Sequence, residues 1–208
     1  MHIAGARMLR DDDSFDRHLP GGIQVMASVH FTPLAVARHA ARLLAPAPGA
    51  RVLDVGSGVG KFCLAAAAEV PGSRFIGVEC RGHLVRVANH LAVDLALANV
   101  EFIHADALDL DWSGYDAFYF FNPFGEQLFD EVFVLDRTIA LHPRNFVAYI
   151  TRVRSRLAGA RIGTRVVTYH GLGAPPPFGF ELARSDRIGT DVVELWVKTR
   201  AYDQMGCW

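Results

Sequence analysis

Short apolar runs alternate with helix-like stretches through the middle of the chain, and this alternation predicts the fold. The apolar runs that fit buried strands cover residues 51–55, 74–79, 100–104, 115–121 and 165–170. The stretches with helical patterns cover residues 34–44, 60–70, 82–98, 126–140 and 143–158. Strands that alternate with helices form parallel sheets covered by helices on both faces. We therefore predict an α/β fold with a Rossmann-like, doubly wound and mostly parallel sheet.

The last part of the chain has a different pattern. Residues 179–186 and 191–199 read as two strands around the turn Arg187-Ile-Gly-Thr190. Two strands joined by a short glycine turn form a hairpin, whereas parallel strands need a longer crossover. The sheet is therefore expected to end in an antiparallel C-terminal hairpin.

The start of the chain lacks both patterns. Residues 1–32 are expected to form an irregular N-terminal segment that could act as a lid, followed by one domain over residues 33–208. Thr32 is a suitable N-cap, and Pro33 a suitable first residue, for the helix over 34–44.

Composition narrows the class of protein. The chain has 208 residues, a net charge of −1 and 51% hydrophobic residues, which is ordinary for a globular domain. Cys63, Cys80 and Cys207 are too few and too scattered for a disulfide framework, and no cysteine–histidine cluster indicates a metal. The sequence shows no signal peptide and no run of about 18 apolar residues, so we expect a cytoplasmic protein that does not span a membrane.

One stretch carries an uneven charge. From Arg137 to Arg165 the chain has seven arginines and no acidic residue. A solvated helix face explains such a stretch, and so does a docking surface for an acidic partner or substrate. The sequence leaves both explanations open.

The segment Val52-Leu-Asp-Val-Gly-Ser-Gly-Val-Gly60 is the most informative about chemistry. An apolar strand runs into Asp54, and glycines at alternate positions lead into a helical stretch. A strand, a glycine turn and a helix N-terminus form a cradle for a ligand with an anionic end. A dinucleotide site would need glycine at Lys61, and a P-loop would need Ser or Thr at Phe62. The remaining pattern, D-x-G-x-G-x-G, is that of S-adenosylmethionine (SAM) methyltransferases.

From about residue 30 onward the chain resembles the class I SAM-dependent methyltransferases, which implies SAM as cofactor. Within that class two segments are similar to the Dot1-like protein-lysine methyltransferases. The first is Asp54-Val-Gly-Ser-Gly-Val-Gly60 with the following Gly77-Val-Glu79, and the second is Phe120-Phe-Asn-Pro-Phe124. The second segment also partly resembles the Asn-Pro-Pro-aromatic motif of enzymes that methylate amino groups.

The cofactor-binding residues have separate expected roles. The glycine turn lets the backbone approach the methionine part of SAM, and Asp54 can face its ammonium group. Glu79 ends the next strand, where its carboxylate can accept hydrogen bonds from both ribose hydroxyls. The resemblance implies that Asp106, or one of the nearby acids Asp109 and Asp111, takes the adenine amino group. The expected set is Asp54, Gly56, Ser57, Gly58, Gly60, Glu79, Cys80, Asp106, Ala107 and Asn122.

The acceptor side is expected at the end of the fourth strand, at the edge where open α/β sheets bind ligands. By the motif, Asn122 and the carbonyl of Pro123 hold the target nitrogen and Phe124 stacks on a planar substrate. These three are the expected catalytic residues. Four further residues are candidates for the border of the cleft: His30, Thr32, Tyr169 and His170.

The predicted function is therefore SAM-dependent methyl transfer, with Asn122 favouring a nitrogen acceptor. The alternatives are an O-methyltransferase of a small metabolite and a non-catalytic SAM-binding protein. The acceptor could belong to a protein, a small molecule or a nucleic acid, and the sequence does not indicate an oligomeric state.

Overall fold

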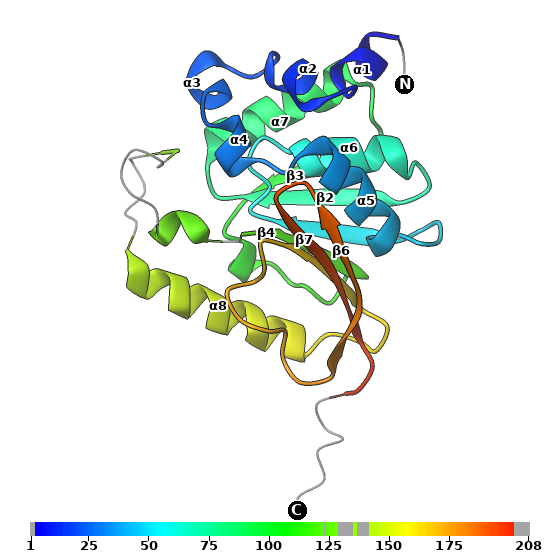
Figure 1. Ribbon diagram of the computed structural model, residues 1–208, viewed down its shortest axis with the longest axis vertical. Helices are drawn as coiled ribbons and strands as arrows, with labels where there is room; N and C mark the ends of the chain where they lie inside the picture. The colour runs from blue at the N-terminus through cyan, green and yellow to red at the C-terminus, as the bar shows by residue number, and fades with distance from the viewer. Residues whose placement is uncertain (1–2, 123, 129–134, 137–141, 202–208) are drawn as a thin grey trace, which may run out of the picture.

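The computed structural model describes residues 3–122, 124–128, 135–136 and 142–201 (Figure 1). Its centre is a seven-stranded sheet with the order β3-β2-β1-β4-β5-β7-β6. The first five strands are parallel: β1 (Arg51–Val55), β2 (Arg74–Glu79), β3 (Val100–His104), β4 (Ala117–Phe121) and β5 (Arg165–Tyr169). The other two, β6 (Phe180–Ile188) and β7 (Asp191–Lys198), form a hairpin in which β7 pairs antiparallel with β5. The predicted sheet and its C-terminal hairpin are confirmed.

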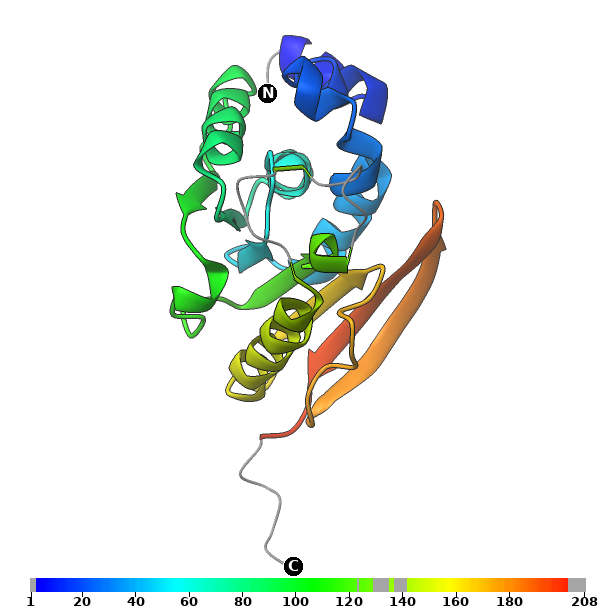
Figure 2. The same cartoon turned by 90° about the vertical axis from the view of Figure 1, so that its left-hand side faces the viewer.

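Helices cover both faces of this sheet (Figure 2). The helices on one face are α5 (Leu34–Leu44), α6 (Lys61–Glu69) and α7 (Gly82–Asp94), and the helix on the other is α8 (Pro143–Ala158). In β4, Tyr119 stacks on Phe62 of α6, while Phe118 and Phe120 belong to the core on the α8 face. Because successive side chains of a strand point to opposite faces, one apolar strand serves both cores.

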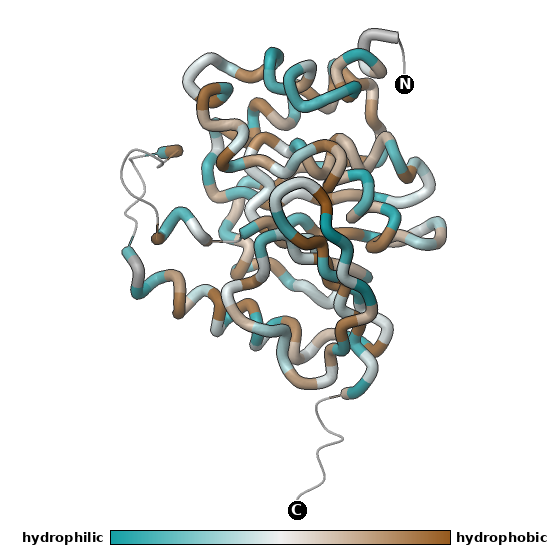
Figure 3. Tube along the Cα trace, viewed as in Figure 1, coloured by the Kyte–Doolittle hydropathy of each residue, from teal (hydrophilic) through white to brown (hydrophobic). Residues whose placement is uncertain are grey.

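Helix α8 is amphipathic. It buries Ile150, Val153 and Leu157 and exposes arginines, so hydrophobic and hydrophilic residues alternate along it (Figure 3). That spacing places its apolar residues on one face, against the sheet.

The N-terminal segment is helical where the sequence predicts irregular chain. It forms α1 (Ile3–Met8), α2 (Asp12–Asp16), α3 (Gly21–Gln24) and α4 (Ala27–His30), gathered at one end of the molecule (Figure 1). Ion pairs to the buried Lys61 hold α2 in place, because Lys61 Nζ lies 2.8 Å from the carboxylates of Asp12 and Asp16. The role of this segment as a lid stays a prediction.

The start of α5 also differs from the prediction. Its N-cap is Pro33, and Thr32 makes no capping bond. The Thr32 hydroxyl instead lies 3.1 Å from the Tyr119 hydroxyl, while Asp12 accepts a 2.9 Å hydrogen bond from the backbone N–H of Leu34. A carboxylate from a distant helix therefore replaces the local cap.

The predicted helix over 126–140 is wrong at the positions the structure describes beyond residue 128. A short 3₁₀ helix, η2 (Gly125–Leu128), follows β4, and residues 135–136 are not helical. The other positions of that prediction, 129–134 and 137–140, lie outside the described residues. Among the helices that the structure describes, none is long and apolar enough to cross a bilayer.

Candidate active site

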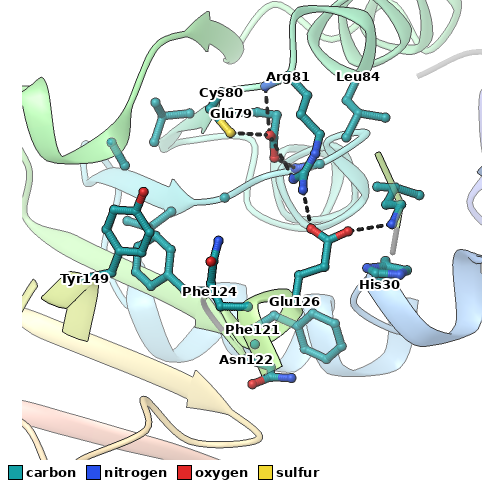
Figure 4. Close-up of a pocket in the computed structure, with 18 of the residues that line it drawn as sticks. His30, Glu79, Cys80, Arg81, Leu84, Phe121, Asn122, Phe124, Glu126 and Tyr149 are labelled. Atoms are coloured by element: carbon teal, nitrogen blue, oxygen red, sulfur yellow. Dashed lines mark hydrogen bonds and ion pairs between the residues drawn. The ribbon is translucent and has the colours of Figure 1, made fainter. Parts of the chain in front are cut away.

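A cavity of about 340 Å³ opens at the carboxyl ends of the central strands (Figure 4). This volume lies in the usual range for small-molecule sites. The cavity is lined by the glycine turn after β1, by residues 78–81, by residues 105–107, by the segment after β4 and by residues 29–31. Figure 4 shows Glu79 and Cys80 on one side, Phe121 and Asn122 on the other, and Glu126 between them.

The three glycines of the turn all have left-handed backbones but serve different purposes. Gly56 (φ +80°) lines the cavity, and a Cβ there would meet nothing within 4 Å. Gly58 (φ +55°) also lines it, and a Cβ there would lie 2.8 Å from the ring of Phe31. Gly60 does not line it; a Cβ there would collide with the Phe102 ring. The turn therefore opens to a ligand at Gly56 and Gly58, and Gly60 serves packing.

Glu79 is held in place before any ligand arrives. Its side chain is 4% exposed, and it accepts hydrogen bonds from the backbone N–H of Gly58 at 3.1 Å and of Arg81 at 2.9 Å. Each carboxylate oxygen can accept further bonds. The Glu79 carboxylate is thus oriented for donors such as the two hydroxyls of a ribose.

Cys80 and Asp106 both line the cavity. The Cys80 thiol contacts Glu79 at 3.3 Å, and burial together with this carboxylate raises the pKa of Cys80 to about 12. Such a thiol stays protonated and is a poor nucleophile. The Asp106 carboxylate accepts a 2.8 Å bond from the backbone N–H of Leu108, which fixes its direction beside Ala107.

Asp54 is buried beneath the turn and does not line the cavity. Burial raises the pKa of Asp54 to about 8, the nearby Glu79 adds to this, and a 3.5 Å hydrogen bond from the Cys63 thiol opposes it. The carboxyl group is therefore protonated in the ligand-free protein at neutral pH. An ammonium group brought close to it would favour the ionised form.

This protonation predicts a pH effect on stability. The folded-state pKa of Asp54 lies above its unfolded value of about 3.9, so its contribution is fully present below that value and is lost as pH rises through about 8. Asp54→Asn keeps the shape without the charge. We expect the melting temperature of the ligand-free wild type to fall between pH 6 and 8.5 by several degrees more than that of Asp54→Asn. Parallel profiles would contradict a protonated Asp54.

The acceptor side has an unusual backbone. Asn122 (φ +39°) and Phe124 (φ +62°) both adopt left-handed conformations, which are uncommon for residues other than glycine. The Asn122 N–H bonds to the Tyr169 carbonyl at 3.1 Å, and Phe124 stacks on Tyr149 with ring centroids 4.8 Å apart. Backbone strain of this kind persists where surrounding contacts enforce it, often at functional sites.

Most of the sequence-predicted site residues meet at this cavity. The predicted residues that line it are Gly56, Gly58, Glu79, Cys80, Asp106, Ala107, Asn122, Phe124 and His30. The predicted residues that do not line it are Asp54, Ser57, Gly60, Thr32, Tyr169 and His170. Pro123 lies outside the described residues. His170 is exposed and pairs with Asp191 at 2.6 Å, so it belongs to the hairpin side of the sheet edge.

Several lining residues carry no sequence signal. Phe31, Glu126, Leu135 and Tyr149 reach the cavity from segments outside the glycine motif. Glu126 follows Asn122 by four residues, and an acid so close to a strand end is the one cue that could have pointed to it. The others depend on tertiary packing.

Buried polar atoms without hydrogen-bond partners also bear on whether the cavity binds a ligand such as SAM. Among the described residues, the buried side-chain atoms without a partner are Ser57 Oγ in the glycine turn and Arg81 Nε in the cavity wall. Buried polar groups are normally satisfied, so the unpaired Arg81 Nε in the cavity wall fits a site for a polar ligand, whereas Ser57 does not line the cavity. The unobstructed turn at Gly56 and the oriented Glu79 point the same way.

Comparison with known families decides the class. A model described as the methyltransferase domain matches residues 46–155, more than half of the chain. The chain belongs to this methyltransferase domain family. The identification as a class I SAM-dependent methyltransferase domain is confirmed, and SAM is its cofactor.

Curated relatives match over a short segment. A tRNA (guanine-N(7)-)-methyltransferase of Synechococcus sp. (strain JA-3-3Ab) is 48% identical over 54 residues, which are 26% of this chain and 23% of that protein. The enzyme of the same name from strain JA-2-3B'a(2-13) is 46% identical over 54 residues. The match thus spans about a quarter of the length of these relatives.

Solved structures share the fold over most of the chain. TrmN from Thermus thermophilus aligns with a TM-score of 0.61 and 24% identity, covering 83% of this chain and 51% of that one. An RNA methyltransferase from Salinibacter ruber in complex with S-adenosyl-L-homocysteine (SAH) aligns with a TM-score of 0.57 and 21% identity, covering 83% and 96%. The mitomycin 7-O-methyltransferase MmcR aligns with a TM-score of 0.59 and 15% identity, covering 94% and 60%.

Proposed function

We propose that this protein is a SAM-dependent methyltransferase that methylates a ring or amino nitrogen of an RNA base. The observation that carries the nitrogen assignment is the position of Asn122, which lines the same cavity as Glu79 and Asp106 from the carboxyl end of β4. Its neutral amide oxygen can accept a hydrogen bond from an N–H and so orient a nitrogen lone pair without acting as a strong base.

The residues of the cavity divide into two groups. Gly56, Gly58, Glu79 and Asp106 would hold SAM, which supplies an electrophilic methyl group to a nucleophile placed in line with it. Asn122 and Phe124 would orient that nucleophile. Positioning and exclusion of water, rather than strong acid–base groups, provide most of the acceleration in such a site.

A planar acceptor fits the aromatic residues at the cavity. Phe121, Phe124 and Tyr149 line it, and Phe124 and Tyr149 form a stacked pair. Aromatic faces bind nucleobases by stacking, and sequence-specific RNA recognition relies on bases that are turned out of the helix. A flat heterocycle with an N–H edge satisfies both Asn122 and this aromatic wall.

The charge on α8 supports an RNA substrate. The helix carries Tyr149 into the cavity, contains no acidic residue and exposes Arg144, Arg152, Arg154 and Arg156. Arg152 lies 3.9 Å from the exposed Asp109, and Arg156 donates to the Leu108 carbonyl at 2.6 Å. Basic side chains next to a site that binds a flat ring would contact phosphates of the same nucleic acid. The curated relatives named tRNA methyltransferases agree with this class.

The resemblance of the glycine loop to Dot1-like enzymes stays a prediction and offers a lysine side chain as another nitrogen acceptor.

One experiment separates RNA, protein and small-molecule acceptors. The protein is incubated with SAM labelled in the methyl group together with RNA, protein and small-molecule fractions of a cell extract. RNA nucleosides are then analysed by mass spectrometry. We expect label on a base nitrogen of RNA. Label in protein, or on an oxygen of a small molecule, would contradict the proposal, and absence of transfer would favour a non-catalytic SAM-binding protein.

Removing arginines from α8 is expected to weaken RNA binding. Among the described residues, Arg144 and Arg154 form no ion pair, so Arg144→Gln with Arg154→Gln should leave folding and SAH affinity unchanged. RNA affinity should fall, and the slope of log K against log salt should decrease by about one per lost phosphate contact. Fluorescence anisotropy over a salt series measures this. Arg74→Gln with Arg187→Gln, two exposed arginines of the sheet that form no ion pair among the described residues, is the control. Equal slopes in all three proteins would remove α8 from RNA binding.

A further inference from the structure

Arg81 lies in the cavity wall between two carboxylates. It is the N-cap residue of α7, two residues after the end of β2, and its side chain is 11% exposed. Its Nη1 lies 3.5 Å from Glu79 Oε1, and its Nη2 forms a close ion pair with Glu126 (Figure 4). The carboxylates of Glu79 and Glu126 raise the pKa of Arg81 although burial alone would lower it. One buried guanidinium thus joins the end of β2 to the segment after β4.

Glu126 extends this link to a third segment. Its side chain is 12% exposed, and its Oε1 accepts a 2.6 Å hydrogen bond from the backbone N–H of Leu135. Leu135 lines the cavity. One chain of contacts therefore runs from Glu79 through Arg81 and Glu126 to Leu135. Each contact involves a charged group, and such hydrogen bonds are stronger than neutral ones.

One nitrogen of the guanidinium, Nε, makes no hydrogen bond to the described residues. Arg81 Nε is buried and has no partner among the described residues, while Arg81 itself lines the cavity. A buried donor without an acceptor is unfavourable, so a ligand oxygen that reaches this N–H would bind more tightly. Glu79, bonded to the backbone N–H of Arg81 at 2.9 Å, offers acceptors beside this donor.

A hydroxyl group matches such a pair because it donates and accepts at the same time. Its hydrogen can bond to the Glu79 carboxylate and its oxygen can accept from Arg81 Nε. Neither group alone distinguishes a hydroxyl from other polar groups, but the two together do. On a ribose, which has two adjacent hydroxyls, one hydroxyl can donate to the Glu79 carboxylate while the other accepts from Arg81 Nε.

We propose that Arg81 binds a ribose hydroxyl of the cofactor through Nε and, by its ion pair with Glu126, couples cofactor binding to the acceptor-side wall. This inference rests on the proposed function in that it assumes SAM in this cavity. Arg81 is then a cofactor-binding residue, and Glu126 is a positioning residue that acts through it.

The test compares two ligands by calorimetry: SAH, and an SAH analogue that lacks both ribose hydroxyls. Arg81→Lys keeps a positive charge between Glu79 and Glu126 but removes the planar group and its Nε. We expect Arg81→Lys to fold and to bind SAH about tenfold more weakly. We also expect the logarithm of its analogue-to-SAH ratio of dissociation constants to be at most half the wild-type value. Arg86→Lys, an exposed arginine one turn further along α7, should behave as wild type.

Glu126→Gln tests the coupling. Glutamine retains an oxygen for the Leu135 N–H but loses the ion pair with Arg81, so we expect SAH affinity to drop about threefold and the preference for ribose hydroxyls to shrink. An unchanged SAH-to-analogue ratio in Arg81→Lys would overturn the role of Arg81, and an unchanged ratio in Glu126→Gln would overturn the coupling. Failure of the wild type to bind SAH at all would instead overturn the proposed function.

Discussion

Replacing Asn122 by alanine is expected to slow methyl transfer by roughly thirty- to a thousandfold while SAH affinity changes little. Asn122 directly follows β4 in the wall opposite Glu79, and the proposed function gives its amide the role of orienting the acceptor. Loss of one preorganised hydrogen bond in a closed site costs about 2–4 kcal/mol in the barrier. Each 1.4 kcal/mol or so is about tenfold in rate. Turnover, SAH affinity and melting temperature are measured on one preparation.

The backbone at this position requires a second variant. Asn122 has φ +39°, which asparagine tolerates better than alanine does, and its side chain occupies the space that a Cβ on Gly125 would need. Asn122→Gly removes the amide without adding backbone strain, so it separates catalysis from folding. We expect both variants to lose turnover to a similar extent, and Asn122→Ala to lose more stability. A stable Asn122→Gly protein with full turnover would remove Asn122 from the mechanism.

Gly58→Val is expected to abolish SAM binding, with affinity lower by roughly a hundredfold or more, the equivalent of about 3 kcal/mol. Gly58 has φ +55°, a conformation that a β-branched residue rarely adopts, and a Cβ there would lie 2.8 Å from the Phe31 ring. The Gly58 N–H also holds the Glu79 carboxylate at 3.1 Å. A side chain at this position disturbs the turn, Phe31 and Glu79 together. Calorimetric titration with SAH measures the effect.

Gly49→Val provides the matched control for Gly58→Val. Gly49 also has a left-handed backbone (φ +92°), but a Cβ there would meet nothing within 4 Å and the residue does not line the cavity. Both variants carry backbone strain, so both should melt at lower temperature. Only Gly58→Val should lose SAH binding. Normal SAH affinity in a folded Gly58→Val protein would contradict the assignment of the glycine turn as the cofactor cradle.

The sheet was predictable because its signals are local. The strands β1 and β2 have the predicted bounds, since each is a short apolar run closed by a turn or a charged residue. The hairpin was predictable from two strand patterns around one short turn. Glycine spacing indicated the cofactor class because each ligand places different demands on the turn.

Features fixed by distant charges could not be predicted in the same way. The helices before residue 31 lie against the domain partly because Asp12 and Asp16 meet the buried Lys61, and each acid is more than 40 positions away from it in sequence. The Arg81–Glu126 ion pair likewise joins the ends of two strands that are separated in the chain. A periodic pattern reports which face of an element is buried, not which polar groups meet across the fold.

The motif also contained residues whose observed position differs from the expected one. Asp54 and Gly60 belong to the D-x-G-x-G-x-G pattern, but Asp54 is buried next to Cys63 and Gly60 makes room for Phe102. Motif positions can support the shape of a loop without facing its ligand. Their direct contact with SAM therefore stays a prediction, unlike the placement of Gly56, Gly58 and Glu79 around the cavity.

A crystal structure of the protein with bound SAH would show whether the cavity at the carboxyl ends of the central strands is the cofactor site. We expect the ribose hydroxyls of SAH to contact Glu79, its adenine to lie beside Asp106 and Ala107, and its sulfur to face Asn122 and Phe124. SAH bound outside this cavity, or bound inside it with its sulfur turned away from Asn122, would contradict the proposed function.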